Sequence, residues 1–174
     1  MAVPDIRNAR FTLPAVAVDI RSPLLQRLLA DWSAACPAAD IPDTAFIDPF
    51  RLRYVLDTLI VVDVVPQPDG SPRFRYRLIG SDIVDRRGRD QTGRWMDENP
   101  DPGLVKLATA ASHAVLAARQ PALLHFSRSL FDRFYPVEAL VLPLGPPGLP
   151  PVRLLAAQIY PKDTPRRRYG DDGR

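Results

Sequence analysis

The sequence predicts one α+β domain built on five antiparallel strands, with helices inserted between the second and the third strand. Residues 58–65 (TLIVVDVV) are β-branched and almost wholly apolar, and residues 73–79 (RFRYRLI) alternate between charged and apolar side chains. Joined by a short connection that contains proline and glycine, these two segments predict a β-hairpin. Three more strand-like segments, 122–131, 135–144 and 152–160, follow one another later in the chain. This order excludes the alternating strands and helices of a doubly wound sheet.

The composition of the chain limits the functional classes. The chain has 174 residues, enough for one domain with a core, and a net charge of +3 from 23 basic and 20 acidic residues. The single cysteine, Cys36, excludes an internal disulfide and a multi-cysteine zinc site. Because no apolar run reaches the about 18 residues that a membrane helix needs, we expect a cytoplasmic protein with no membrane partner.

The first predicted helix spans residues 22–36. Ser22 supplies a capping hydroxyl, Pro23 suits the first helical position, and Cys36-Pro37 ends the helix. Its apolar stripe must cover either the domain's own sheet or a second copy of the chain. We take the stripe as the candidate contact of a homodimer; it consists of Leu24, Leu25, Leu28, Leu29 and Trp32.

Helical segments also fill the stretch between the two groups of strands. Gly88 and Gly93 break residues 81–99 into short helical pieces, whereas residues 101–119 form a longer helix that begins with an Asp-Pro cap. Another short helix is expected over 49–56. The helices between the strands are expected to close over the sheet.

These segments divide the chain into four parts. We expect an extended arm (1–21), an N-terminal helical flank (22–56), the sheet-containing domain (57–162) and a disordered basic tail (163–174). Within the sheet, the strand at 73–79 has one apolar and one basic face, as an edge strand can. The apolar face, expected against the helices, has Phe74, Tyr76 and Leu78, and the outward face has Arg73, Arg75 and Arg77.

Five antiparallel strands with helices after the second strand form the arrangement of PAS domains. The segments IDP (47–49), RFRYRLIGSDIV (73–84), GRDQTGRWMDE (88–98) and VEALVLPLG (137–145) also resemble the stand-alone PAS proteins common in alphaproteobacteria, a family of largely unknown function. The resemblance covers residues 22–160. It implies the sheet order 2-1-5-4-3, with strands 1 and 5 central, and a ligand cavity walled by the short helices that follow Gly80.

Seven residues are candidates for lining that cavity. Trp95 and Met96 are apolar and stand where the resemblance places the cavity-lining helix, while His113 and His125 approach it from a helix and from a strand. Without a partner motif, structural or surface roles are the ordinary ones for both histidines. The full set is Tyr76, Leu78, Ile83, Trp95, Met96, His113 and His125.

The polar segment 89–94 admits two interpretations. The side chains of Asp90 and Thr92 can bond backbone N–H groups and fix a turn, with Gly93 as its permissive residue. Alternatively, Arg89 and Arg94 contact an anionic ligand, because a guanidinium group suits a carboxylate or a phosphate.

No motif indicates catalysis, a metal or a cofactor. Adjacent residues on a helix point apart, which separates Ser112 from His113, and no Gly-x-Ser-x-Gly elbow occurs. Cys36 lacks the surroundings of a flavin-binding cysteine, and a lone histidine fits haem poorly, so the motifs support neither haem nor flavin. Asp82, Asp85 and Asp90 are expected in solvated ion pairs with neighbouring arginines. We therefore expect no enzyme and name no catalytic residue.

Three functions remain open at this point. The first is a single-domain sensory or protein-interaction module that acts through a small-molecule ligand or dimerisation on a signalling partner still to be identified. The second is an enzyme or carrier that uses the cavity. The third is weak nucleic-acid binding through Arg73, Arg75 and Arg77 and the tail arginines 166–168. Since a net charge of +3 attracts phosphate only modestly, we do not expect a nucleic-acid partner.

Overall fold

The structure, a computed structural model that describes residues 6–166, is α+β, with one antiparallel sheet of six strands in the order β1-β4-β5-β6-β2-β3. The strands are β1 (Ile6–Thr12), β2 (Leu59–Pro66), β3 (Pro72–Ile79), β4 (Ala122–Leu130), β5 (Arg133–Leu144) and β6 (Arg153–Ile159). The prediction of five strands is wrong by one, because β1 adds a sixth strand beside β4. The other five are the strands that the sequence predicts, and they lie in the order β4-β5-β6-β2-β3.

Strand β1 corrects the prediction of an extended arm over 1–21. Ile6 pairs with Arg128 and Thr12 with Leu123, and the register shifts between Arg7 and Arg10. Only Ile6 is buried in this strand, so no alternation of apolar and polar residues marks it in the sequence. Backbone pairing with the edge of β4 holds the segment in place.

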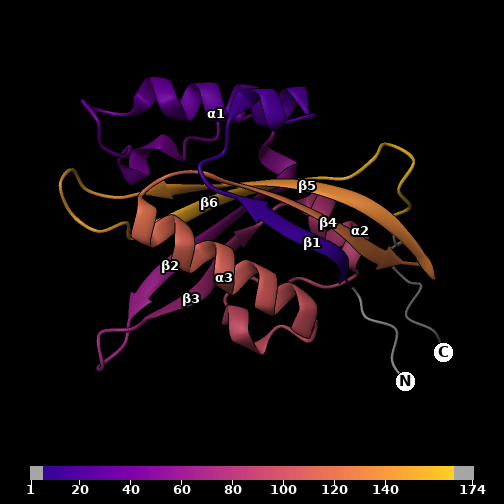
Figure 1. Cartoon of the computed structure of the whole chain (residues 1–174). Coiled ribbons are helices and arrows are strands. Elements are labelled where there is room, and N and C mark those ends of the chain that lie inside the picture. The colour runs from indigo at the N-terminus through magenta and orange to yellow at the C-terminus, as the bar shows by residue number, and fades with distance from the viewer. Residues whose placement is uncertain (1–5, 167–174) are drawn as a thin grey trace.

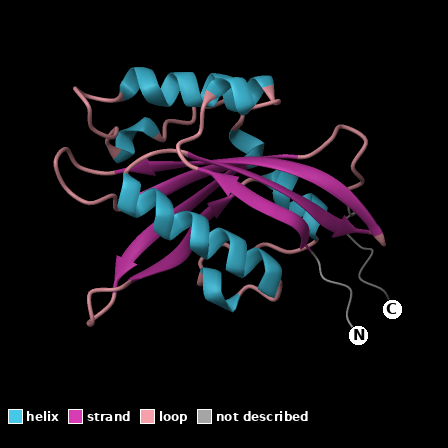
Figure 2. Cartoon of the chain, in the orientation of Figure 1, coloured by secondary structure: helices cyan, strands magenta, loops and turns pink. Residues whose placement is uncertain are grey.

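The helices form layers on both faces of the sheet, as Figures 1 and 2 show. Helix α1 (Pro23–Ala35) covers one face, and α3 (Pro102–Ala118) covers the other. The Oγ atom of Ser22 accepts a hydrogen bond from Leu25 N, and the carboxylate of Asp101 accepts one from Leu104 N, so both predicted caps and both predicted helices are confirmed. The short helix expected over 49–56 is wrong: that segment forms turns, followed by a 3-10 helix at Leu56–Thr58.

The apolar stripe of α1 packs against the chain's own sheet. Its buried members are Leu25, Leu28, Leu29 and Trp32. The indole N–H of Trp32 donates to the carbonyl oxygen of Pro143, 3.0 Å away on β5. Of the five candidate dimer contacts only Leu24 is exposed. The stripe is therefore not a free dimer surface, and the homodimer itself stays a prediction.

The β2–β3 hairpin is confirmed, with β2 inside the sheet and β3 at its edge. The pairing shifts between Val61 and Val62, so that Val61 faces Leu78 and Val62 faces Tyr76. Arg77 is the extra residue of this bulge, and the alternation of the strand breaks there. Tyr76 is buried as expected, but Leu78 is 42% exposed on the same side as Val61, away from α3.

Between β3 and β4 the chain forms short helices, as the sequence predicts. They are α2 (Ser81–Arg87) and the 3-10 helix η4 (Met96–Glu98). Arg86 in α2 donates to the carbonyl oxygen of Thr164 at 2.6 Å, and Thr164 is buried. The expected disordered tail is therefore wrong for residues 163–166, whereas 167–174 lie outside the described residues. No helix within 6–166 combines the length and apolar character needed to cross a membrane.

Candidate functional site

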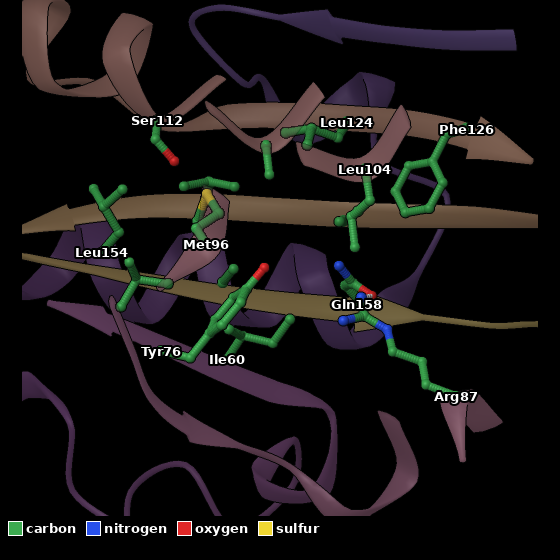
Figure 3. Close-up of a pocket in the computed structure, with 15 residues that line it drawn as sticks. Ile60, Tyr76, Arg87, Met96, Leu104, Ser112, Leu124, Phe126, Leu154 and Gln158 are labelled. Carbon is green, nitrogen blue, oxygen red and sulfur yellow. Dashed lines mark hydrogen bonds between the residues drawn. The ribbon is translucent and has the colours of Figure 1, made fainter. Parts of the chain in front are cut away.

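A cavity of about 50 Å³ lies between α3 and the sheet, and Figure 3 shows the side chains around it. Its wall is mostly apolar, with Leu104 from α3, Leu124 and Phe126 from β4, and Ile60 and Leu154 from β2 and β6. Small residues in its wall leave the space open. These are Ala108 on α3, Ala139 on β5 and Ala156 on β6.

Four polar side chains interrupt this apolar wall. Ser112, Tyr76, Gln158 and Arg87 come from α3, β3, β6 and α2, respectively. In Figure 3 the guanidinium group of Arg87 lies beside Gln158 at one end of the cavity, and Ser112 lies at the other. Burial raises the pKa of the Tyr76 hydroxyl, although the charge of Arg87 acts in the opposite direction. Tyr76 is therefore a neutral hydrogen-bonding group at pH 7.

Arg87 is the most unusual group in the wall. Only 9% of the residue is exposed. Its Nη2 atom donates to Oε1 of Gln158 at 2.8 Å. Its Nε and Nη1 atoms are buried and have no hydrogen-bond partner among the described residues. Buried polar groups are nearly always paired, and each unpaired one costs about 1–3 kcal/mol. The fold thus keeps a charged group in a costly position beside the cavity.

A second, polar pocket of about 200 Å³ shares Arg87 with the apolar cavity. Arg89, Asp101 and Arg128 also line it. One carboxylate oxygen of Asp101 caps α3, and the other lies 3.3 Å from Nη2 of Arg128. With three arginines and one aspartate, the pocket is cationic. Together the two spaces form an apolar cavity and a cationic pocket, and Arg87 lines both.

The structure brings three of the nine predicted ligand-contact residues to these spaces. Tyr76 and Met96 line the apolar cavity, and Arg89 lines the polar pocket. Ile83 is wholly buried but packs in the core beside the cavity without lining it. Trp95 does not line it either, because its ring lies 4.1 Å under the guanidinium group of Arg73. Leu78 is turned away by the bulge, as described above.

The two histidines do not meet in the cavity. His113 is exposed on α3, and its ring contacts the Phe74 ring edge-on at a centroid distance of 5.2 Å. His125 lies on the opposite face of the sheet, where its Nε2 atom is 3.2 Å from Oε2 of Glu138. That carboxylate also accepts the backbone N–H of Arg21 and so fixes the entry to α1. Both cavity assignments are therefore wrong.

The turn interpretation of 89–94 is confirmed by its hydrogen bonds. Oδ1 of Asp90 accepts from Thr92 N at 2.8 Å and from the Thr92 hydroxyl at 2.6 Å, and Gly93 has a φ of 82°. Arg94 is exposed and lines neither space, so the structure does not support it as an anion contact. Arg89 stands at the exposed rim of the polar pocket.

The sequence reasoning missed Arg87, Arg128, Ser112 and Gln158. A signal for Arg128 was present, because it alternates with Phe126 and Leu130 on the apolar face of its strand. A charged residue at a core position marks either a buried ion pair or a site. The sequence gives no such signal for Arg87, because two adjacent arginines before a glycine are typical of a solvated helix end.

Several other charged residues form ion pairs. Asp82 is buried, contrary to the expectation of a solvated pair, and accepts from Arg86 at 2.8 Å and Arg166 at 2.5 Å. Oδ2 of Asp63 lies 3.6 Å from Nη2 of Arg75 and 3.5 Å from Nη1 of Arg77, so Asp63 neutralises part of the positive charge of the β3 arginines. Among residues 6–166 no group of three or more metal-ligating side chains comes together.

Comparisons with known proteins give a distant likeness to solved structures. No family model matches the chain, and no curated protein matches it. Among solved structures, the chain is similar to one described as an RNA-binding light-oxygen-voltage receptor, at 15% identity and a TM-score of 0.47. The alignment covers 91% of this chain and 40% of the receptor chain.

Proposed function

We propose that this chain is a PAS-like sensory module that binds a small molecule between α3 and the sheet. The observation that carries the proposal is Arg87, which lines the cavity and whose buried Nε and Nη1 atoms have no hydrogen-bond partner among the described residues. A ligand that accepts hydrogen bonds from this group offsets a cost of about 1–3 kcal/mol per unpaired atom.

The character of the cavity supports the same proposal. Small-molecule sites are mostly apolar and carry a few convergent polar groups, and here Tyr76, Arg87 and Ser112 are such groups. They come from separate elements, so a bound molecule would bridge β3, α2 and α3. Occupancy would change how these elements hold together, which gives the module a signal for a partner protein. We propose no catalytic role for these residues.

Filling the cavity tests the proposal. Ala108 lines it, whereas Ala110 is exposed on the same helix, so Ala108→Leu and Ala110→Leu make a matched pair with the same change of side chain. Native mass spectrometry of freshly purified protein would detect a retained molecule. A small-molecule library screened by NMR against methyl signals of Met96 and Leu124 would detect weaker binding, to a Kd of about 1 mM.

We expect ligands that bind the wild type and the Ala110→Leu variant but not the Ala108→Leu variant. Two results would overturn the proposal. One is a screen in which nothing perturbs the methyl signals of the cavity. The other is a set of ligands whose affinity is the same in both variants, because such ligands bind elsewhere.

A further inference from the structure

The geometry points to a short-chain carboxylate as the ligand, with its carbons in the apolar cavity and its carboxylate on Arg87. This inference rests on the proposed function, since it names the chemical class that the same cavity selects. Arg87 lines both spaces, so a molecule that reaches it from the cavity has apolar side chains around one end and the guanidinium group of Arg87 at the other. A molecule with an apolar chain and an anionic head matches that arrangement.

The charges around Arg87 favour an anion over a neutral polar head. Its one hydrogen bond to a side chain goes to Gln158, a neutral amide, so no carboxylate of the described chain is hydrogen-bonded to it. Asp101, the acidic residue of the polar pocket, caps α3 and pairs with Arg128. Arg89 adds a second positive charge at the rim. Charge-assisted hydrogen bonds from a guanidinium group to a carboxylate are among the strongest that proteins form.

The volume of the cavity sets the length of the chain. An apolar cavity of about 150 Å³ accepts benzene, with six carbons. The cavity here has about 50 Å³, a third of that volume. Scaled by volume, the cavity accommodates about two or three carbons. Propionate has two carbons beyond its carboxylate, and butyrate has three.

Burial distinguishes a carboxylate from a phosphate. The Nε and Nη1 atoms of Arg87 are out of contact with bulk solvent, so an anion must lose water to reach them. Removing water from a doubly charged phosphate costs far more than from a singly charged carboxylate. Inorganic phosphate also has no apolar part to occupy the cavity.

The test is an NMR titration of the full chain with propionate and butyrate. Propionamide and butyramide serve as neutral molecules of nearly the same shape, and inorganic phosphate serves as an anion without a chain. The titrations are repeated on Arg87→Met and on the control Arg94→Met, which removes an exposed arginine that lines neither space. The readout is the Kd from shifts of the Met96 and Leu124 methyl signals.

We expect a carboxylate to bind at least about tenfold more tightly than its amide, as loss of a charge-assisted hydrogen bond implies. Arg87→Met should remove that preference, and Arg94→Met should keep it. Equal binding of acid and amide to the wild type overturns the inference while leaving a ligand cavity in place. This comparison needs no variant, so it holds even if Arg87→Met fails to fold. Phosphate binding as tight as that of butyrate, or binding of no carboxylate, also overturns the inference. If library molecules fail as well, the proposed function fails with it.

Discussion

Two neighbouring arginines of α2 should respond in opposite ways to the same substitution. Arg86 and Arg87 are both buried, at 5% and 9% exposure. Replacing Arg86 by methionine is expected to lower the free energy of unfolding strongly. Replacing Arg87 by methionine is expected to leave it unchanged or to raise it, because Arg87 serves the cavity and not the fold.

The magnitudes follow from the partners of each side chain. Arg86 donates to Asp82 at 2.8 Å and to the carbonyl oxygen of Thr164 at 2.6 Å. Breaking a buried pair costs about 3–5 kcal/mol, and we expect the lower end because Arg166 still contacts Asp82. Removing Arg87 relieves two unpaired atoms, about 1–3 kcal/mol each. It also loses the bond to Gln158 and leaves that amide oxygen unpaired, a loss of about 2–4 kcal/mol.

Relief of about 2–6 kcal/mol against a loss of about 2–4 kcal/mol gives, at the midpoints of the two ranges, about 1 kcal/mol of added stability for Arg87→Met. Urea unfolding of extensively dialysed protein, followed by circular dichroism, measures both variants against the wild type. The double variant Arg87→Met/Gln158→Met removes both partners and should be at least as stable as Arg87→Met alone. If Arg87→Met loses as much stability as Arg86→Met, Arg87 is a structural residue and the ligand site loses its principal support.

Two further predictions concern the segment around α2. A Cβ atom on Gly80 would lie 2.2 Å from the carbonyl oxygen of Asp57, so Gly80→Ala should cost about 3 kcal/mol in urea unfolding. Gly70→Ala, where φ is 82° and no atom lies within 4 Å of the new Cβ, should cost only about 1 kcal/mol; equal losses would contradict the steric argument. Burial raises the pKa of Asp82, but its bonds to Arg86 and Arg166 outweigh this and lower it. Its stabilisation is therefore present above the unfolded pKa of about 3.9 and is lost as the pH falls through the folded pKa. Asp82→Asn should lower stability at pH 7 and flatten the acid limb of the stability profile, and an unchanged acid limb would refute this assignment.

Segments with strong local signals could be predicted from the sequence. The β-branched run of β2 and the alternation of β3 specify a hairpin, and Ser22-Pro23 and Asp101-Pro102 specify the starts of α1 and α3. In each case the local pattern and the packed structure agree. The order of elements then leaves few ways to assemble one antiparallel sheet.

Features that depend on tertiary contacts could not be predicted in the same way. Strand β1 has almost no buried face and is defined by its pairing with β4. The outward position of Leu78 depends on a bulge at Arg77. No residue type in the sequence indicates where such a shift of register occurs. The role of Arg87 depends on Gln158, which is 71 residues away in the chain. The spacing of residues in the sequence does not predict such a contact.

The two faces of strand β5 differ in the size of the side chains that they present near the cavity. On the α1 face, β5 presents Leu140 and Leu142, which are fully buried and fill the space under the helix. On the α3 face, the same strand presents Ala139, which lines the cavity together with Ala156 and Ala108. Since side chains alternate along a strand, β5 supplies Leu140 and Leu142 to one face and the smaller Ala139 and Val141 to the other. Protein cores are close-packed when the side-chain volumes fill the available space. The small residues on the α3 face leave part of that space unfilled, and this opens the cavity beside Arg87. A fully packed apolar core would exclude such a charged group.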